Sequence, residues 1–187
     1  MSDARESDTR EQAGYGRTAK SLHWLIVILL VLQYVVAWTM PEIHRNTQPE
    51  TLINLHLSLG IAILAIALIR FAVRLLHPVP LLRQTMAAWQ VRAAQLAHGL
   101  LYFLLFVLPL LGWASASSRG WHIAVFGLPV PSFLPADPAR AGRLGDVHSF
   151  VAYLLLALIG LHLLAALYHH FWRRDRVLLR MMPGARA

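Results

Sequence analysis

The sequence predicts an all-α integral membrane protein: a four-helix bundle with both termini in the cytoplasm. Of its 187 residues, 57% are hydrophobic and only 14% are charged, against about 25% charged in soluble domains. The apolar residues fall into four runs separated by charged or proline-rich stretches. Each run approaches the ~20 residues that cross a bilayer as a helix. Helix is the structure expected at this length, because backbone groups in hydrocarbon must be satisfied within the segment.

The elements follow in order along the chain. Residues 1–15 are polar and mixed in charge, which predicts a mobile tail. A single four-helix domain then occupies residues 16–182, and residues 183–187 form a short C-terminal tail. The first apolar run is too long for a signal-peptide core and has no small-residue cleavage site, so we expect it to be retained. The four predicted spans cover approximately residues 22–40, 52–69, 96–114 and 147–172.

The connection between the third and fourth spans reads GWHIAVFGLPVPSFLP and is aromatic, apolar and broken by prolines. We expect it to lie along the outer interface of the membrane. The fourth run is longer than a bilayer requires, so the helix is expected to tilt or to project from the bilayer.

Basic residues indicate the orientation of the bundle. Thirteen of the 17 Lys and Arg residues lie in the N-terminal tail, the second loop and the C-terminal tail, and four lie on the opposite side. By the positive-inside rule, both termini are cytoplasmic. The formal net charge of +8 is therefore interpreted as setting topology, and no nucleic-acid partner is expected.

Composition also restricts the chemistry. The absence of cysteine excludes disulfides, thiolate-held iron–sulfur clusters, thiol catalysis and covalent haem attachment, and leaves ten histidines as candidate ligands. All nine acidic residues lie outside the predicted spans, which disfavours a metal-ion transporter, because such transport paths usually contain intramembrane carboxylates. No flavin or nicotinamide fingerprint is present, so an external electron donor or acceptor is needed.

Span direction places the histidines at two depths. His148 and His162 are 14 residues apart, which is roughly 21 Å along a helix and close to four full turns, so they share one face. An outer level holds His56 and His148, and an inner level holds His162 with either His23 or His98. Paired imidazoles in a dry bundle suit a haem with two axial histidines, whereas a lone histidine near a helix end is more often an interfacial side chain.

Other residues are candidates to surround such haems. Gly60 and Gly160 remove side-chain bulk near His56 and His162, or serve only in helix packing. Four basic residues at the inner mouth are candidates to pair with haem propionates or to set topology alone: Arg17, Lys20, Arg70 and Arg74.

The chain resembles the bacterial dihaem cytochrome b561 family from about Tyr15 to Pro183. The resemblance is carried by YGRTAKSLHW, INLHLSLG, LAHGLLYFLLFVLPLLGW, VHSFVAYLLLALIGLHLLAALYHHFW and the ending LLRMMPG. It implies a location in the bacterial inner membrane and two haem b groups. It also implies that His23 pairs with His162 at the inner haem and His56 with His148 at the outer one.

The same resemblance implies a function. One type within the family oxidises superoxide to dioxygen at the outer surface and passes the electrons to ubiquinone. The alternative is an electron-transfer subunit, not itself an enzyme, that serves a partner dehydrogenase or periplasmic redox protein. The outer loops carry four Arg against four acidic residues, so their summed charge gives an anion no attraction.

Quinone reduction needs protons, and an imidazole near the inner mouth is a candidate to relay them. His169 is the first candidate, with His98 and His170 after it. His98 is then expected beside the inner haem or a quinone. The alternative interpretation of the YHHFW stretch is an interfacial belt of aromatic and snorkelling side chains, which we favour for His170.

Overall fold

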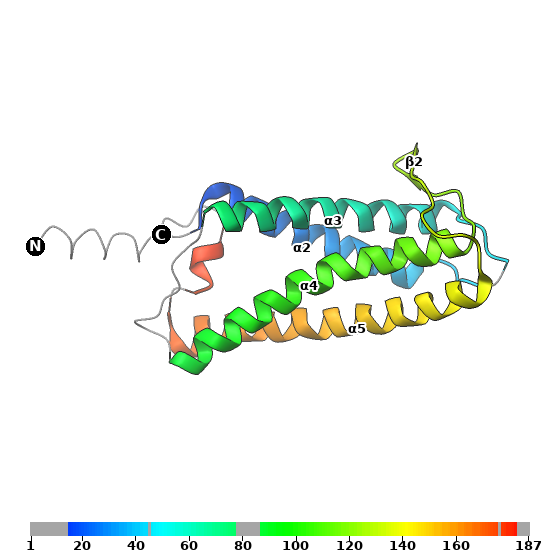
Figure 1. The fold of residues 1–187 in the computed structure, drawn as a ribbon. Coiled ribbons are helices and arrows are strands. Elements are labelled where there is room, and N and C mark those ends of the chain that lie inside the picture. The colour runs from blue at the N-terminus through cyan, green and yellow to red at the C-terminus, as the bar shows by residue number, and fades with distance from the viewer. Residues whose placement is uncertain (1–14, 45, 78–86, 176, 183–187) are drawn as a thin grey trace, which may run out of the picture.

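The computed structural model describes residues 15–44, 46–77, 87–175 and 177–182. The expected N-terminal tail (except Tyr15) and the C-terminal tail at 183–187 lie outside these ranges. Within them the chain forms four long apolar helices (Figure 1), each long and apolar enough to cross a membrane. These helices are α2 (Arg17–Thr39), α3 (Thr51–Leu76), α4 (Ala88–Ser118) and α5 (Pro138–Tyr168).

The predicted membrane four-helix bundle is confirmed, but the helices extend beyond the apolar runs. Helix α3 continues past the predicted end of its span through Arg70 and Arg74, and α4 begins eight residues before its predicted span. Apolar runs mark the part of a helix that meets hydrocarbon, whereas Ala, Leu, Gln and Arg continue a helix equally well in water. Helix α5 begins at Pro138 because Asp137 caps it, accepting hydrogen bonds from the Ala139 and Arg140 amides.

Helices that follow one another in the sequence also pack against one another in the bundle. Helix α2 packs on α3, α3 on α4, and α4 on α5, and the Tyr34 hydroxyl on α2 donates to the Ala152 carbonyl on α5 at 2.7 Å. Helices α2 and α4 begin, and α3 and α5 end, at one end of the bundle (Figure 1). We call this the termini end, and the opposite end the hairpin end.

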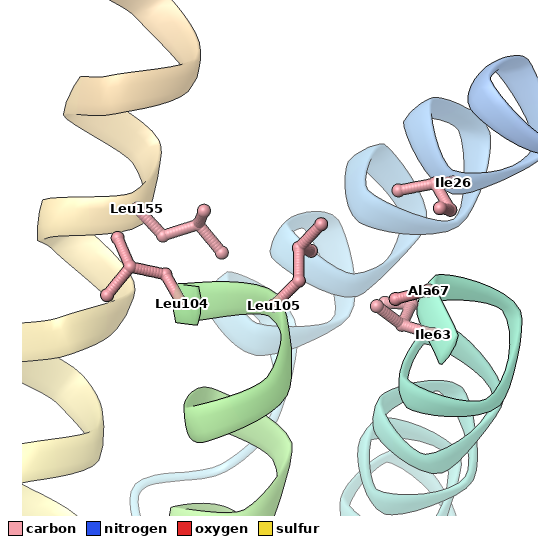
Figure 2. Close-up of a cluster of buried hydrophobic side chains, with 6 residues drawn as sticks. All are labelled: Ile26, Ile63, Ala67, Leu104, Leu105 and Leu155. Atoms are coloured by element: carbon pink, nitrogen blue, oxygen red, sulfur yellow. The ribbon is translucent and has the colours of Figure 1, made fainter. Parts of the chain in front are cut away.

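An apolar core fills the middle of the bundle. Six buried side chains from all four helices form it (Figure 2): Ile26, Ile63, Ala67, Leu104, Leu105 and Leu155. Leu155 lies seven residues from both His148 and His162 on α5. The core therefore separates the two predicted histidine levels.

The connection between α4 and α5 forms a two-stranded antiparallel hairpin, β1 (Ala124–Val125) with β2 (Leu128–Pro129). Phe126 and Gly127 have φ of 49° and 84°, as the tight turn of a hairpin requires. The buried Ser58 hydroxyl on α3 accepts a hydrogen bond from the Phe126 amide at 3.0 Å. This hairpin was not predicted. It fixes the loop to the bundle while exposing Phe126 and Leu128, as an interfacial segment would.

A hydrogen-bonded turn follows α5 and returns the chain to the first helix. The π-helix η1 (His169–Arg173) continues α5, and the short 3-10 helix η2 (Leu179–Met181) follows. The Trp24 indole on α2 donates to the Met181 carbonyl at 2.9 Å, and Lys20 donates to the Met182 carbonyl. The end of the described chain is thereby tied to the start of α2.

Candidate functional site

Two histidines meet at the hairpin end, as the sequence predicted. His56 on α3 and His148 on α5 are partly buried, with ring centres 6.1 Å apart and ring planes at 73°. An imidazole nitrogen lies about 2 Å from a bound metal ion and roughly 1 Å from its own ring centre, so two rings that flank one ion stand roughly 6 Å apart. We call His56 and His148 the hairpin-end pair.

Hydrogen bonds assign the tautomer of each ring in this pair. The Nδ1 atom of His148 lies 3.0 Å from the Leu108 carbonyl. A carbonyl only accepts, so Nδ1 carries the proton and Nε2 keeps its lone pair. The Gln33 amide nitrogen donates to the His56 carbonyl at 3.1 Å, which fixes its orientation, and lies 3.2 Å from His56 Nε2. His56 Nε2 is thus also an acceptor, and both rings leave Nε2 unprotonated, the form in which imidazole binds a metal ion, although at His56 the Gln33 amide engages that lone pair here.

A glycine allows His148 to approach α4. A Cβ atom built at Gly112 would lie 3.1 Å from Cε1 and 3.3 Å from Nδ1 of the His148 ring. Any larger residue would push the ring away from the Leu108 carbonyl. Sequence reasoning missed both Gly112 and Gln33, since each acts on a histidine of another helix.

The hairpin-end pair lines a cavity of about 200 Å³. Its walls are mainly apolar and aromatic, with contributions from Tyr34, Trp38, Trp113 and Tyr153. Gly60 lines it as well, and a Cβ there would make ordinary contact with Gln33 at 3.7 Å. A concave, apolar space with two convergent imidazoles fits a flat, largely apolar macrocycle held through its metal.

Three histidines gather at the termini end. The rings of His98 on α4 and His162 on α5 have centres 5.5 Å apart and planes at 68°. His23 on α2 has His162 and Arg70 in its electrostatic neighbourhood and stacks edge-on against Trp24. We call His23, His98 and His162 the termini-end cluster. The structure brings both candidate partners to His162, and the direct ring contact is with His98.

A guanidinium lies beside this cluster. Arg70 on α3 donates to the Ala19 carbonyl on α2 at 2.5 Å, and its charge acts on all three histidines. In the described ranges the ion pairs are His44–Glu42 and His169–Asp175, so Arg70 faces no carboxylate there. A partly buried cation among neutral rings favours an anionic ligand group. Arg74 also lies near His98, whereas Arg17 is exposed at the first turn of α2.

His169 lies apart from both groups, in the π-helix after α5. It is buried, and its Nδ1 atom is 2.5 Å from Oδ2 of Asp175. From the sequence, Asp175 was counted only among the acidic residues outside the predicted spans. A six-residue spacing from His169 matches no regular helix face and so gave no signal. His170 is only partly buried, with its ring against Phe171, as expected for an interfacial side chain.

A membrane-spanning bundle that offers paired imidazoles at two levels has the architecture of a membrane b-type cytochrome. The chain belongs to the prokaryotic cytochrome b561 family, whose model matches residues 14–184. It is therefore a multi-pass membrane protein of electron transfer, and membership implies that it binds haem b.

Relatives from several bacteria match most of the chain. A Yersinia pestis protein named probable superoxide oxidase CybB is 35% identical over 169 residues, 88% of this chain and 93% of that protein. Cytochrome b562 of Cereibacter sphaeroides is 30% identical, over 92% of this chain and 97% of that protein. Cytochrome b561 homolog 1 of Escherichia coli K12 is 28% identical, over 90% and 97%.

Proposed function

We propose that the protein is a dihaem b cytochrome of the bacterial inner membrane that oxidises superoxide at its outer face and reduces ubiquinone near its cytoplasmic face. The observation that carries the proposal is the pair of histidine sites on one face of α5, separated by the apolar core. His148 and His162 are 14 residues apart, roughly 21 Å along the helix. One helix thus supports two redox sites that together cross most of the hydrocarbon.

Basic residues support the orientation. The termini end carries Lys20, Arg70, Arg74 and Arg173 in the described chain, and the positive-inside rule assigns that end to the cytoplasm. The hairpin end then faces outward. The relative named probable superoxide oxidase supports the choice of donor.

The residues have separate tasks. His56 and His148 would hold the outer haem, and His23 and His162 the inner one, with His98 beside it. Arg70 is placed to neutralise a propionate, with Arg74 and Arg17 as further candidates. Each haem, when bound, would supply a one-electron redox centre. Two superoxide ions lose one electron each and become dioxygen, and ubiquinone gains two electrons and two protons to become ubiquinol.

Protons for the quinone must come from residues at the termini end. We assign this relay to His169, with His98 as a second candidate. His169 lies near the cytoplasmic end of α5 and is held by Asp175. A neutral imidazole accepts a proton at one nitrogen and later releases it to an acceptor.

The arrangement of outer arginines bears on the donor. The Arg140 guanidinium donates to the Ser118 hydroxyl and the Pro135 carbonyl, and Arg119 donates to the His44 carbonyl. These hydrogen-bond partners are neutral, but the Arg140 charge also acts on the Asp137 carboxylate, so Arg119 is the clearer source of positive charge at the outer face. That charge supports local attraction of an anion even though the outer loops are neutral in sum.

The competing function is an electron-transfer subunit for a partner dehydrogenase or periplasmic redox protein. The neutral sum of the outer loops favours it. Stopped-flow decay of superoxide with purified holoprotein, with and without a soluble ubiquinone, separates the two. We expect decay faster than spontaneous dismutation and one quinol formed per two superoxide ions. Decay at the spontaneous rate would contradict the oxidase proposal and support the partner subunit.

A further inference from the structure

We infer that Asp175 is a positioning residue that fixes the His169 imidazole in one tautomer for proton delivery to the quinone. The inference deepens the proposed function and rests on it. His169 is the proposed proton donor, and Asp175 acts only through it. The inference is carried by the geometry of the turn after α5.

The π-helix brings the two residues together. On a straight α-helix, residues six apart point about 120° away from one another and lie roughly 9 Å apart along the axis. Here η1 widens the last turn, and Arg174 adopts a left-handed conformation with φ of 52°. The Asp175 amide then donates back to the His169 carbonyl at 3.2 Å. Single π turns of this kind are frequent at functional sites.

Three hydrogen bonds hold the pair as one unit. Asp175 uses Oδ2 to accept from His169 Nδ1 and Oδ1 to accept from the Val177 amide at 3.0 Å. The backbone bond from Asp175 to His169 is the third. Because both carboxylate oxygens are engaged, neither the carboxylate nor the ring can rotate without losing a bond.

Both side chains of the His169–Asp175 contact are largely buried. The His169 side chain is 11% exposed and that of Asp175 is 19% exposed. A carboxylate withdrawn from water is costly unless it is hydrogen-bonded, and here its partners include a ring that itself can carry a positive charge. The carboxylate therefore stabilises both the Nδ1–H tautomer and the imidazolium that forms when Nε2 gains a proton.

The chemical step balances with the electrons that the proposed function supplies. The Nε2–H bond of the imidazolium breaks as an O–H bond forms on the reduced quinone, and His169 returns to its neutral Nδ1–H form. Water at the cytoplasmic surface then reprotonates Nε2. Two electrons and two such protons convert one quinone into one quinol. Asp175 keeps its charge throughout and only orients the ring.

The competing role for Asp175 is a purely structural one, closing the C-terminal segment against the bundle. That segment has separate anchors, because Trp24 and Lys20 on α2 donate to the Met181 and Met182 carbonyls. Loss of the Asp175 carboxylate is therefore expected to leave η2 docked and the protein folded. A readout that a structural role would not change is the tautomer of His169.

The test uses the full-length holoprotein and three variants: Asp175→Asn, Asp175→Glu and, as a matched control in the same turn, His170→Gln. Dithionite-reduced haems are mixed with a soluble ubiquinone, and their oxidation is followed by stopped-flow absorbance. This half-reaction needs no superoxide. We expect Asp175→Asn to slow the rate at saturating quinone at least about tenfold with little change in the half-saturating concentration. Asp175→Glu should restore most of the rate, and His170→Gln should match the wild type.

A second measurement is independent of activity. In protein carrying ¹⁵N-labelled histidine, the His169 signals, assigned by their loss in His169→Gln, should report the Nδ1–H tautomer. In Asp175→Asn they should report a mixture. Adding Asp175→Asn to His169→Gln should slow quinone reduction no further, because the two residues act as one unit.

The outcomes are separable. If quinone fails to oxidise the wild-type haems, the proposed function falls and this inference falls with it. If quinone oxidises wild type and Asp175→Asn equally fast, or if the His169 tautomer is unchanged, only the role of Asp175 is overturned. Equal slowing in Asp175→Asn and Asp175→Glu together with lower thermal stability would show a structural role instead.

Discussion

The two ends of the bundle offer histidines in different ways. At the hairpin end, two imidazoles face each other, and each tautomer is set by a neutral hydrogen-bond partner, the Leu108 carbonyl or the Gln33 amide. At the termini end, three imidazoles lie near one guanidinium. The first arrangement offers a candidate ligand pair by geometry alone. The second provides a ligand pair and one further titratable ring, which suits a site where electron transfer is coupled to protons.

The largest expected effect is loss of a complete haem from the hairpin end. His148→Ala leaves His56 without its facing ring, so the purified protein should retain one haem b per chain instead of two. Haem content and the reduced-minus-oxidised absorbance spectrum measure this. His44→Ala is the matched control, because His44 is an exposed histidine near the same end, and it should keep both haems. Full haem content in His148→Ala would remove that residue from the ligand set.

The termini-end cluster is tested by replacing its two candidate partners of His162 separately. On the family pattern, His23→Ala should lose the inner haem. His98→Ala should keep it but oxidise more slowly with quinone. Haem content and the spectrum of the remaining haem distinguish the two variants. Loss of the inner haem in His98→Ala but not in His23→Ala would show that the ring contact between His98 and His162 marks the true pair.

A smaller effect is expected from Gly112→Ala. The added Cβ would press on the His148 ring, so the ring must shift by a few tenths of an ångström and weaken its bond to Leu108. We expect a several-fold faster loss of the outer haem to an excess of a haem-binding acceptor protein. Gly142→Ala on α5 is the control, because a Cβ there meets no atom within 4 Å. Equal rates in the two variants would show that Gly112 has no role in seating His148.

The smallest effect concerns the cap of α5. The Arg140 backbone amide, together with the charge of that side chain, holds the pKa of Asp137 below its ordinary value. A lowered folded-state pKa contributes stability above the unfolded value and loses it as pH falls through the folded value. Asp137→Ala should therefore lower the melting temperature slightly at neutral pH, with the difference from wild type shrinking below about pH 4.

Thermal unfolding followed by circular dichroism across this pH range measures the effect. Asp137→Asn keeps the capping oxygen without the charge, so its stability difference from Asp137→Ala should persist at low pH. A constant difference between wild type and Asp137→Ala over the whole range would show that the charge contributes nothing.

Much of the fold follows from residue pattern alone. Four apolar runs of bilayer length and a biased distribution of arginines were sufficient for the membrane bundle, because hydrocarbon permits few backbone structures. Helical periodicity predicts that His148 and His162 share one face of α5. Matching depths predict that His56 meets His148. The ambiguity between His23 and His98 also came from depth, and the structure places both near His162.

The features that sequence could not supply depend on contacts between helices or on irregular backbone. Leu108 acts through a carbonyl, which its side-chain type does not reveal. Gly112 and Gln33 are ordinary residues in apolar runs until a neighbouring helix places a histidine against them. Asp175 required a π turn and a left-handed residue to reach His169. The helices extend beyond the predicted spans because hydropathy reports the bilayer and not the helix.

For Gly60 and Gly160, the sequence could not choose between two interpretations. The sequence left helix packing and room for a ligand as equal alternatives. A Cβ at Gly160 would meet no described atom within 4 Å, and one at Gly60 would make only ordinary contact. Close packing between the described helices therefore does not require either glycine, which favours the interpretation as room for a ligand.

The central claim is that one bundle carries two haem sites, one at each end of α5. The haem b content of purified full-length protein, measured as haem per chain by pyridine haemochrome absorbance and quantitative amino-acid analysis, tests it most directly. The account predicts two haems per chain, titrating as two one-electron centres. A ratio of one or below in fully loaded protein would contradict it.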